Sequence, residues 1–201
     1  HAKEASDLGL PFVGVGFLYP QGYFRQRLPS HGWQEAIYEP LDMNDVPILP
    51  VKRADGEDMC ISVDMGGRTV KARIWRIQVG RVPLFLMDTD VPANDPWDRE
   101  LSARLYSGDN EMRIRQELML GVGGVRLLDE LGYHPSVLHM NEGHSAFLLL
   151  ESIRQEVNRG RNFEDACERV KARTVFTTHT PVPAGHDACP FYLMDKYFHG
   201  F

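Results

Sequence analysis

The spacing of hydrophobic residues changes once along this chain, at "VPANDPWD" (residues 91–98). Before this segment, apolar and polar residues alternate, as in "MCISVDM" (59–65) and "TVKARI" (69–74), which is the pattern of strands with one buried face. After it, apolar residues recur at spacings of three and four, which is the pattern of amphipathic helices. A chain that carries both patterns in separate blocks is predicted to be a mixed α/β protein.

Residues 45–90 read as an antiparallel β-meander. A "GG" turn at residues 66–67 joins the two alternating segments, and "RVPLFLMDTD" (81–90) predicts a further strand. Upstream, "PFVGVGFLY" (11–19) is almost wholly apolar, which predicts a strand buried on both faces, as in a parallel sheet.

The last third of the chain predicts strands and helices in the order strand, helix, helix, strand. The short apolar segments "PSVLHM" (135–140) and "TVFTTH" (174–179) read as the strands of a βαβ-type unit. A helix is expected to begin just after Gly143, and Asn162 is expected to cap another that runs through Val170. The expected apolar stripes are Ile114, Leu118, Val122, Val125, Leu128 and Leu131 on a helix before these strands, and Phe147, Leu150, Ile153 and Val157 on the helix after Gly143.

Composition restricts the class of protein and its partners. The chain has 201 residues, of which 43% are hydrophobic and 25% charged, as is ordinary for a globular domain. A net charge of −6 without a basic block predicts no nucleic-acid partner, and the lack of a long apolar run predicts no membrane partner. Cys60, Cys167 and Cys189 lack C-x-x-C spacing, which favours a cytoplasmic protein over a disulfide framework. The first residues read as the middle of a helix, so we expect a longer protein.

Titratable residues stand where the two predicted strands of the last third end. Glu142 and His144 follow the first strand, and His179 ends the second. The carboxyl ends of parallel strands form the edge at which ligands bind in open α/β sheets. We therefore expect these strands to be adjacent and parallel, with the three side chains facing one cleft.

Other interpretations of these residues remain open from the sequence alone. A histidine at a strand end is often a hydrogen-bonded structural residue. His144, His179, His186 and Glu142 are competent metal ligands, but H-E-x-x-H and the other short ligand spacings are missing, so no metal site is predicted. The glycines of "GVGG" (121–124) miss the G-x-G-x-x-G spacing, and close helix packing is favoured over a nucleotide loop.

Four segments, in the same order, resemble the α-glucan (glycogen and maltodextrin) phosphorylases, and the bacterial and archaeal branch most closely. These segments are "SDLGLPFVGVGFLYPQGYFRQRL", "RLYSGDNEMRIRQEL", "HMNEGHSAF" and "VFTTHTPVPAGHD". The resemblance extends over essentially the whole chain. It implies an α/β fold, the Rossmann-like N-terminal domain of a GT-B glycosyltransferase. Residues 1–201 would form the later part of that domain as a single partial domain, with 45–90 as an antiparallel β-hairpin insertion.

The resemblance also implies an activity. These phosphorylases are retaining glycosyltransferases that use inorganic phosphate to release the terminal α-1,4-linked glucose of a glucan as glucose 1-phosphate. Their cofactor is pyridoxal phosphate, held by a lysine of a C-terminal domain outside this chain, so no cofactor-binding residue is expected here. We expect the isolated chain to be inactive. Whether the full-length protein forms a homo-oligomer remains open.

By resemblance, the catalytic residues of this chain are His179, Glu142 and His144. His179 would lie against the glucosyl unit and contribute its side chain and its backbone carbonyl near the developing positive charge. Glu142 takes the acidic position of the strand-end motif and His144 that of the accompanying histidine, while the exact role of Glu142 stays open. The residues that match the substrate-binding loop and the arginine after it are Asp109, Asn110 and Arg113.

Two further classes of function remain. A sugar-nucleotide-dependent GT-B glycosyltransferase of the glycogen-synthase type would share the architecture but use another donor. A non-catalytic glucan-binding module would bind sugar on exposed aromatic residues, and Trp33, Trp75 and Trp97 are too scattered to indicate such a surface. The absorbance of pyridoxal phosphate in the full-length protein would distinguish the three classes.

Overall fold

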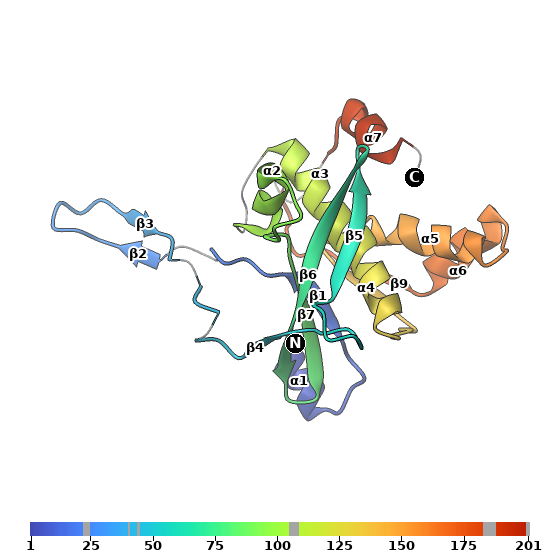
Figure 1. The fold of residues 1–201 in the computed structure, drawn as a ribbon, viewed down its shortest axis with the longest axis horizontal. Coiled ribbons are helices and arrows are strands. Elements are labelled where there is room, and N and C mark those ends of the chain that lie inside the picture. The colour runs from blue at the N-terminus through green and yellow to red at the C-terminus, as the bar shows by residue number, and fades with distance from the viewer. Residues whose placement is uncertain (22–24, 40, 44, 105–108, 183–187, 200–201) are drawn as a thin grey trace. The chain divides into compact units, whose positions relative to one another are not determined.

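The computed structural model describes residues 1–21, 25–39, 41–43, 45–104, 109–182 and 188–199. The chain divides into two compact units. Unit 1 comprises His1–Cys60 and Lys71–Ser107, and unit 2 comprises Ile61–Val70 and Gly108–Phe201. Helices and strands are both well represented, which confirms the predicted α/β class (Figure 1).

Unit 1 is built around a sheet with the strand order β1-β7-β6-β4. β1 runs parallel to β7, with Gly14 opposite Leu84, while β6 is antiparallel to β7 and to β4. Its elements are α1 (Ala2–Asp7), β1 (Gly14–Phe17), β2 (Arg25–Arg27), β3 (Glu35–Ile37), β4 (Ile48–Pro50), β6 (Arg68–Val79, which begins in unit 2), β7 (Val82–Asp88), α2 (Pro96–Arg99) and the 3₁₀ helix η1 (Glu100–Ser102). The predicted meander and the predicted parallel strand therefore belong to one sheet.

The strand predicted within residues 11–19 is confirmed as β1, but its expected burial on both faces is wrong. Only Phe17 of this strand is buried, and Gly14, Val15 and Gly16 are half-buried. β1 lies at the end of the strand order and pairs with β7 alone among the described strands of its sheet. An edge strand has one neighbour, which explains its partial exposure.

The alternating segments fold as their pattern predicts. In β5 (Cys60–Met65), Ile61, Val63 and Met65 are buried while the residues between them are exposed. Gly66 and Gly67 form the turn into β6 at φ values of 61° and 83°, a conformation that glycine adopts without a steric cost. In β6 the buried side chains are those of Val70, Ala72 and Ile74.

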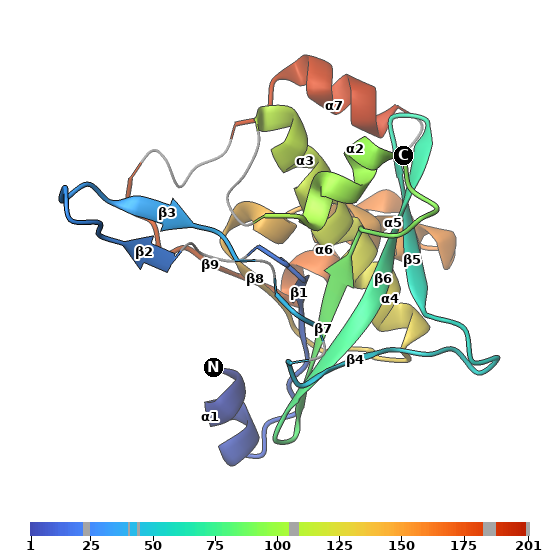
Figure 2. The same cartoon turned by 60° about the vertical axis from the view of Figure 1, so that its left-hand side comes forward.

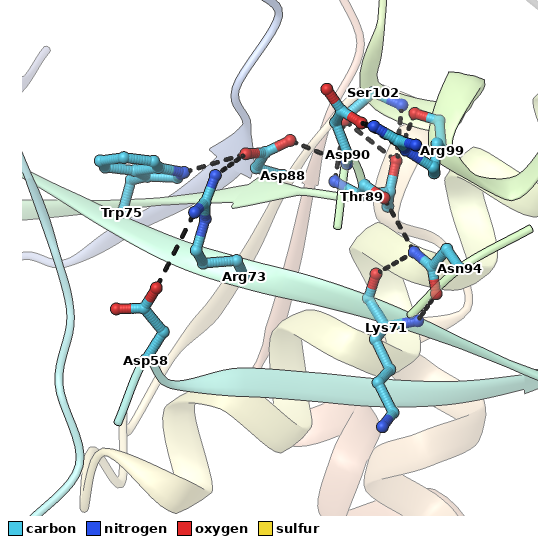
Figure 3. Close-up of polar contacts among 10 residues, drawn as sticks. All are labelled: Asp58, Lys71, Arg73, Trp75, Asp88, Thr89, Asp90, Asn94, Arg99 and Ser102. Atoms are coloured by element: carbon cyan, nitrogen blue, oxygen red, sulfur yellow. Dashed lines mark hydrogen bonds and ion pairs between the residues drawn. The ribbon is translucent and has the colours of Figure 1, made fainter. Parts of the chain in front are cut away.

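Buried polar side chains hold the segment after β7 in place (Figure 3). Asn94 accepts a hydrogen bond from the Lys71 amide at 2.9 Å and donates to the Lys71 carbonyl at 2.7 Å and to the Thr89 carbonyl at 2.8 Å. The Thr89 amide donates to Ser102 Oγ at 2.9 Å, and the Ser102 amide donates to Thr89 Oγ1 at 3.0 Å. These bonds satisfy groups that would otherwise be buried without partners, so "VPANDPWD" is an ordered connection.

A second group in Figure 3 surrounds the buried carboxylate of Asp88. Arg73 and the indole nitrogen of Trp75 both donate to Asp88 Oδ2 at 3.1 Å. The guanidinium of Arg73 also lies over the Trp75 ring, 4.6 Å from its centroid. The buried charge of Asp88 is thus paired and hydrogen-bonded, as burial in a protein interior requires.

Unit 2 consists mainly of helices around the parallel pair β8 and β9. Its core includes Val125, Leu138, Met140 and Leu148, which pack together. Its elements after the hairpin are α3 (Asn110–Leu118), the π-helix η2 (Met119–Gly123), α4 (Gly124–Glu130), β8 (Leu138–Asn141), the 3₁₀ helix η3 (Gly143–Ser145), α5 (Leu148–Asn158), α6 (Phe163–Ala172), β9 (Thr174–Thr177) and α7 (Phe191–Phe198). Asn162 caps α6 by accepting from the Asp165 amide at 2.8 Å, which confirms the predicted cap.

α3, η2 and α4 follow one another without a break, and the predicted stripe is buried at Ile114, Leu118, Val122 and Val125. Gly121 lies where η2 meets the start of α5. A Cβ atom at Gly121 would stand 2.7 Å from the amide nitrogen of Leu148 and 2.9 Å from the carbonyl carbon of Phe147. Close helix packing is therefore confirmed as the reason for a glycine at this position of "GVGG".

The apolar stripe predicted for α5 is wrong. Leu150 and Val157 are exposed, at 38% and 39%, while the buried residues of this helix include Glu151 and Glu156. The side chain of Glu151 is 0% exposed and forms ion pairs with Arg126 at 3.2 Å and Arg154 at 2.6 Å. Burial alone would raise the pKa of Glu151, but the hydrogen bonds from Arg154 and Arg126 hold it below its ordinary value. Ion pairs replace apolar packing on this face.

No helix in the described ranges is long and apolar enough to cross a membrane. Cys60, Cys167 and Cys189, all within the described ranges, form no disulfide.

Candidate functional site

The candidate site lies where β8 and β9 end in unit 2 (Figure 2). The two strands are adjacent and parallel, with Leu138 opposite Thr174 and Asn141 opposite Thr177, as predicted. The Glu142 amide then donates to the Thr177 carbonyl at 2.9 Å, which extends the pairing one residue beyond β8. Both strands therefore deliver their following residues to the same edge.

His179 is held at this edge by two contacts. Its Nε2 lies 2.7 Å from Oδ1 of Asn141, the last residue of β8, and its backbone amide donates to the carboxylate of Glu142. An amide oxygen only accepts hydrogen bonds, so in this arrangement Nε2 carries the proton and Nδ1 of a neutral ring is an acceptor. The His179 side chain is otherwise exposed, which leaves it accessible to a ligand.

The carboxylate of Glu142 binds the segment after β9. Besides the His179 amide, its Oε1 accepts from the Thr180 amide at 2.9 Å and from the Thr180 hydroxyl at 3.3 Å. Its Oε2 accepts from the Thr178 hydroxyl at 3.4 Å. The hydrogen bond from the His179 amide is the main reason why the pKa of Glu142 lies below its ordinary value. Glu142 is therefore a charged acceptor that connects the two strand ends.

The backbone of Glu142 is unusual. Its φ of 62° and ψ of −171° fall in a region that is essentially restricted to glycine. Within the described part of the chain, it is the single residue other than glycine with a positive φ. Such conformations persist only where the surrounding contacts enforce them.

His144 lies two residues after Glu142, in the middle of η3, and is half-buried. The helices α3 and η2 pack against η3. Within the described residues, no hydrogen bond or ion pair links the His144 side chain to Glu142 or to His179. The structure thus brings Glu142 and His179 together, whereas a cleft shared with His144 stays a prediction.

The residues predicted for the substrate loop stand at the start of α3. Asp109 caps this helix, because its Oδ1 accepts from the Met112 amide at 2.9 Å. Asn110 is exposed, and Arg113 Nε lies 3.9 Å from a carboxylate oxygen of Glu117. The Asp109 side chain is therefore engaged within its own helix. A contact of Asp109, Asn110 or Arg113 with sugar stays a prediction.

Among the described residues, no group of at least three His, Cys, Asp or Glu side chains could hold a metal ion. His186, one of the candidate ligands, lies outside the described residues.

Sequence reasoning missed Asn141, Thr178 and Thr180. All three contact the predicted site residues directly. A usable signal was present, because Asn141 directly follows the first predicted strand and the threonines flank His179. Polar residues next to a strand end belong to the same edge as the residue that ends it.

These observations define an α/β protein with a hydrogen-bonded Glu–His–Asn cluster at the carboxyl ends of two parallel strands. No family model matches the chain. Maltodextrin phosphorylase of Thermococcus litoralis is 44% identical over 196 residues, and glycogen phosphorylase of Mycobacterium tuberculosis is 47% identical over 204 residues, each covering 98% of this chain and 24% of the relative. Glycogen phosphorylase of Aquifex aeolicus is 39% identical over 199 residues, covering 98% of this chain and 28% of the relative.

These matches confirm the resemblance: the chain is homologous to part of the α-glucan phosphorylases. It spans about a quarter of the length of the first curated relatives that it matches, at 24%. Among solved structures, the catalytic domain of starch synthase IV from Arabidopsis thaliana bound to ADP and acarbose aligns with a TM-score of 0.39 and 14% identity, covering 64% of this chain and 22% of that chain. That similarity is too weak to support an inference.

Proposed function

We propose that this chain is part of an α-1,4-glucan phosphorylase. The enzyme would transfer the terminal glucosyl unit of glycogen or maltodextrin to inorganic phosphate and release glucose 1-phosphate with retained configuration. The observation that carries the proposal is the match of 98% of the chain, at 39–47% identity, to relatives named maltodextrin or glycogen phosphorylase. A GT-B architecture and a cytoplasmic location are part of the same proposal.

His179 is the residue we assign to the glucosyl unit. Glucosyl transfer passes through an oxocarbenium-like transition state, which oriented carbonyl oxygens and carboxylates stabilise. The accessible ring of His179 offers one hydrogen-bonding group to a sugar hydroxyl, because Asn141 already binds the other at 2.7 Å. One well-placed polar group of this kind typically contributes about 10²–10³ in rate.

The remaining site residues complete the sugar subsite in this proposal. Glu142 and His144 follow the same strand end: the Glu142 carboxylate contacts the His179 amide, and His144 supplies a second imidazole. The substrate-binding residues are Asp109, Asn110 and Arg113, at the start of the helix that packs against η3.

The proposed enzyme requires pyridoxal phosphate, whose phosphate group supplies proton transfer when the cofactor is bound. The described residues at the candidate site do not fit a site for it. Lys52 pairs with Asp58 and Lys196 with Glu111. None of the described residues that contact Glu142 or His179 is a lysine. We therefore assign the cofactor to residues outside this sequence.

Phosphorolysis by the full-length protein tests the proposal. The protein is incubated with maltodextrin and inorganic phosphate, and glucose 1-phosphate is measured, with a parallel reaction that lacks phosphate. Phosphate-dependent formation of glucose 1-phosphate is the expected result. Glucan elongation from a sugar nucleotide without any phosphorolysis would instead indicate a glycogen-synthase-type transferase and refute the proposal.

A further inference from the structure

We propose that Glu142 is a positioning residue: its carboxylate holds residues 178–180 in place and thereby sets the position of His179. This inference rests on the proposed function only for its effect on catalysis. The clamp itself, defined as the Glu142 carboxylate and the groups of residues 178–180 that it binds, is a feature of the structure and can be tested without any activity.

The backbone at Glu142 indicates that its side chain is held by compensating contacts. Glu142 occupies a conformation suited to glycine, although the neighbouring Gly143 has no need of one, since its φ is not positive. A side chain at such a position is unfavourable unless it makes compensating contacts. In this structure the compensation is visible, because the Glu142 side chain reaches back to the segment that follows β9.

The two carboxylate oxygens of Glu142 are both occupied by groups of residues 178–180. Oε1 of Glu142 binds two successive backbone amides, those of His179 and Thr180, and both oxygens also receive threonine hydroxyls. A carboxylate that accepts several hydrogen bonds favours its charged form. It is therefore badly suited to give or take a proton at neutral pH, and well suited to fix a loop.

The clamp acts on the residue that we assign to the glucosyl unit, His179. The His179 ring is bound at Nε2 by Asn141 and its backbone amide by Glu142, so the two residues together determine where its ring and its carbonyl point. Asn141 and Glu142 are consecutive in the chain. Loss of the Glu142 contact would leave His179 attached through its ring alone. A displacement of about 1 Å in a site of this kind can lower a rate roughly 100-fold.

Three substitutions in the full-length protein separate the possible roles. Glu142→Gln retains an oxygen that accepts from the two amides but removes the charge. Glu142→Ala removes the acceptor and keeps a side chain at a φ of 62°. Glu142→Gly removes the acceptor and relieves the unfavourable backbone conformation. Gly143→Ala is the matched control, because no atom lies within 4 Å of the Cβ that it would add.

Hydrogen exchange of the His179 and Thr180 amides is the first readout. We expect both amides to exchange at least 10-fold faster in Glu142→Ala and Glu142→Gly than in wild type, and at about the wild-type rate in Glu142→Gln and Gly143→Ala. Wild-type exchange in both Glu142→Ala and Glu142→Gly would overturn the clamp. This readout does not depend on the protein being a phosphorylase, so it can succeed or fail independently of the proposed function.

Phosphorolysis is the second readout. Glu142→Ala and Glu142→Gly should lower kcat about 100-fold, while Glu142→Gln should stay within about 10-fold of wild type. The melting temperature of Glu142→Gly should exceed that of Glu142→Ala, because only glycine tolerates the backbone conformation. A Glu142→Gln enzyme as inactive as Glu142→Ala would show that the charge itself acts in the reaction, and would overturn the positioning role.

Discussion

Replacing Gly121 by alanine should lower the free energy of unfolding, whereas the same substitution in an ordinary helix raises it. In a solvent-exposed helix, glycine to alanine stabilises by about 1 kcal/mol. In this chain the added Cβ would lie 2.7 Å from the Leu148 amide nitrogen and 2.9 Å from the Phe147 carbonyl carbon. Such atoms normally approach to about 3.5–4.0 Å, so the two backbones would have to separate by about 1 Å.

The balance of these effects gives the expected magnitude. Overpacking costs about 1–3 kcal/mol, and the upper end applies because the obstructing atoms are backbone atoms that cannot rotate away. After subtraction of the gain of about 1 kcal/mol in helix propensity, Gly121→Ala should lower the free energy of unfolding by about 1–2 kcal/mol. Gly121→Val, which adds two further methyl groups, should lower it more.

Urea unfolding followed by far-UV circular dichroism measures this difference. The midpoint should shift to lower urea for Gly121→Ala and further for Gly121→Val, with similar slopes for all three proteins. A Gly121→Ala protein as stable as wild type, or more stable, would refute the close approach of η2 to the start of α5.

Three further predictions concern buried polar groups. Asn94→Ala should lower the free energy of unfolding by about 2–3 kcal/mol, because backbone groups of Lys71 and Thr89 lose their partner. Asn94→Asp should lose at least as much in the same urea titration, because its carboxylate cannot donate to the Lys71 and Thr89 carbonyls that Asn94 binds. Tyr197→Phe removes a buried hydroxyl that donates to Glu111 at 2.5 Å and should cost about 1–2 kcal/mol, and an unchanged urea midpoint would contradict this. Because the pKa of Glu151 lies below its ordinary value of 4.5 in the folded chain, its contribution to stability is present above that value and is lost as the pH falls through the folded pKa. Glu151→Gln should therefore flatten the acid side of a plot of unfolding free energy against pH, and an unchanged slope would exclude this role.

Local periodicity was sufficient to predict β1, β5, β6 and β7, but it gave no signal for the short strands β2 and β3, whose residues are mostly exposed. Val70, Ala72 and Ile74 are buried as their alternation with polar residues indicates, because successive side chains of a strand point to opposite faces. The order strand, helix, helix, strand in the last third was also predicted from the spacing of apolar residues. Its interpretation as a βαβ-type unit predicted that β8 and β9 are adjacent and parallel.

The spacing of apolar residues predicted the wrong buried face for α5, because ion pairs bury glutamate side chains there. Leucine and valine were expected inside, yet Leu150 and Val157 are exposed and Glu151 is buried. Glu151 has two partners: Arg154 lies three residues later in the same helix, but Arg126 is 25 residues earlier in the chain. A buried ion pair depends on such distant partners, which the spacing of hydrophobic residues in one helix does not reveal.

The clamp at Glu142 was equally hidden from sequence reasoning. Local rules place glycine, and not glutamate, at a φ of 62°. The contacts that hold Glu142 there come from residues 178–180, more than thirty positions later, as in its 2.9 Å bond with the Thr180 amide. The motif predicted a site at this edge, and only the structure revealed how the edge is held together.

The central claim is that the cluster at the ends of β8 and β9 is the sugar subsite of a phosphorylase. Steady-state phosphorolysis of maltodextrin by full-length wild-type and His179→Ala proteins tests it most directly. We expect kcat to fall about 10²–10³-fold with a much smaller change in KM, because His179 acts mainly on the transition state. A His179→Ala enzyme with the wild-type kcat and KM would contradict the assignment of His179 to the glucosyl unit.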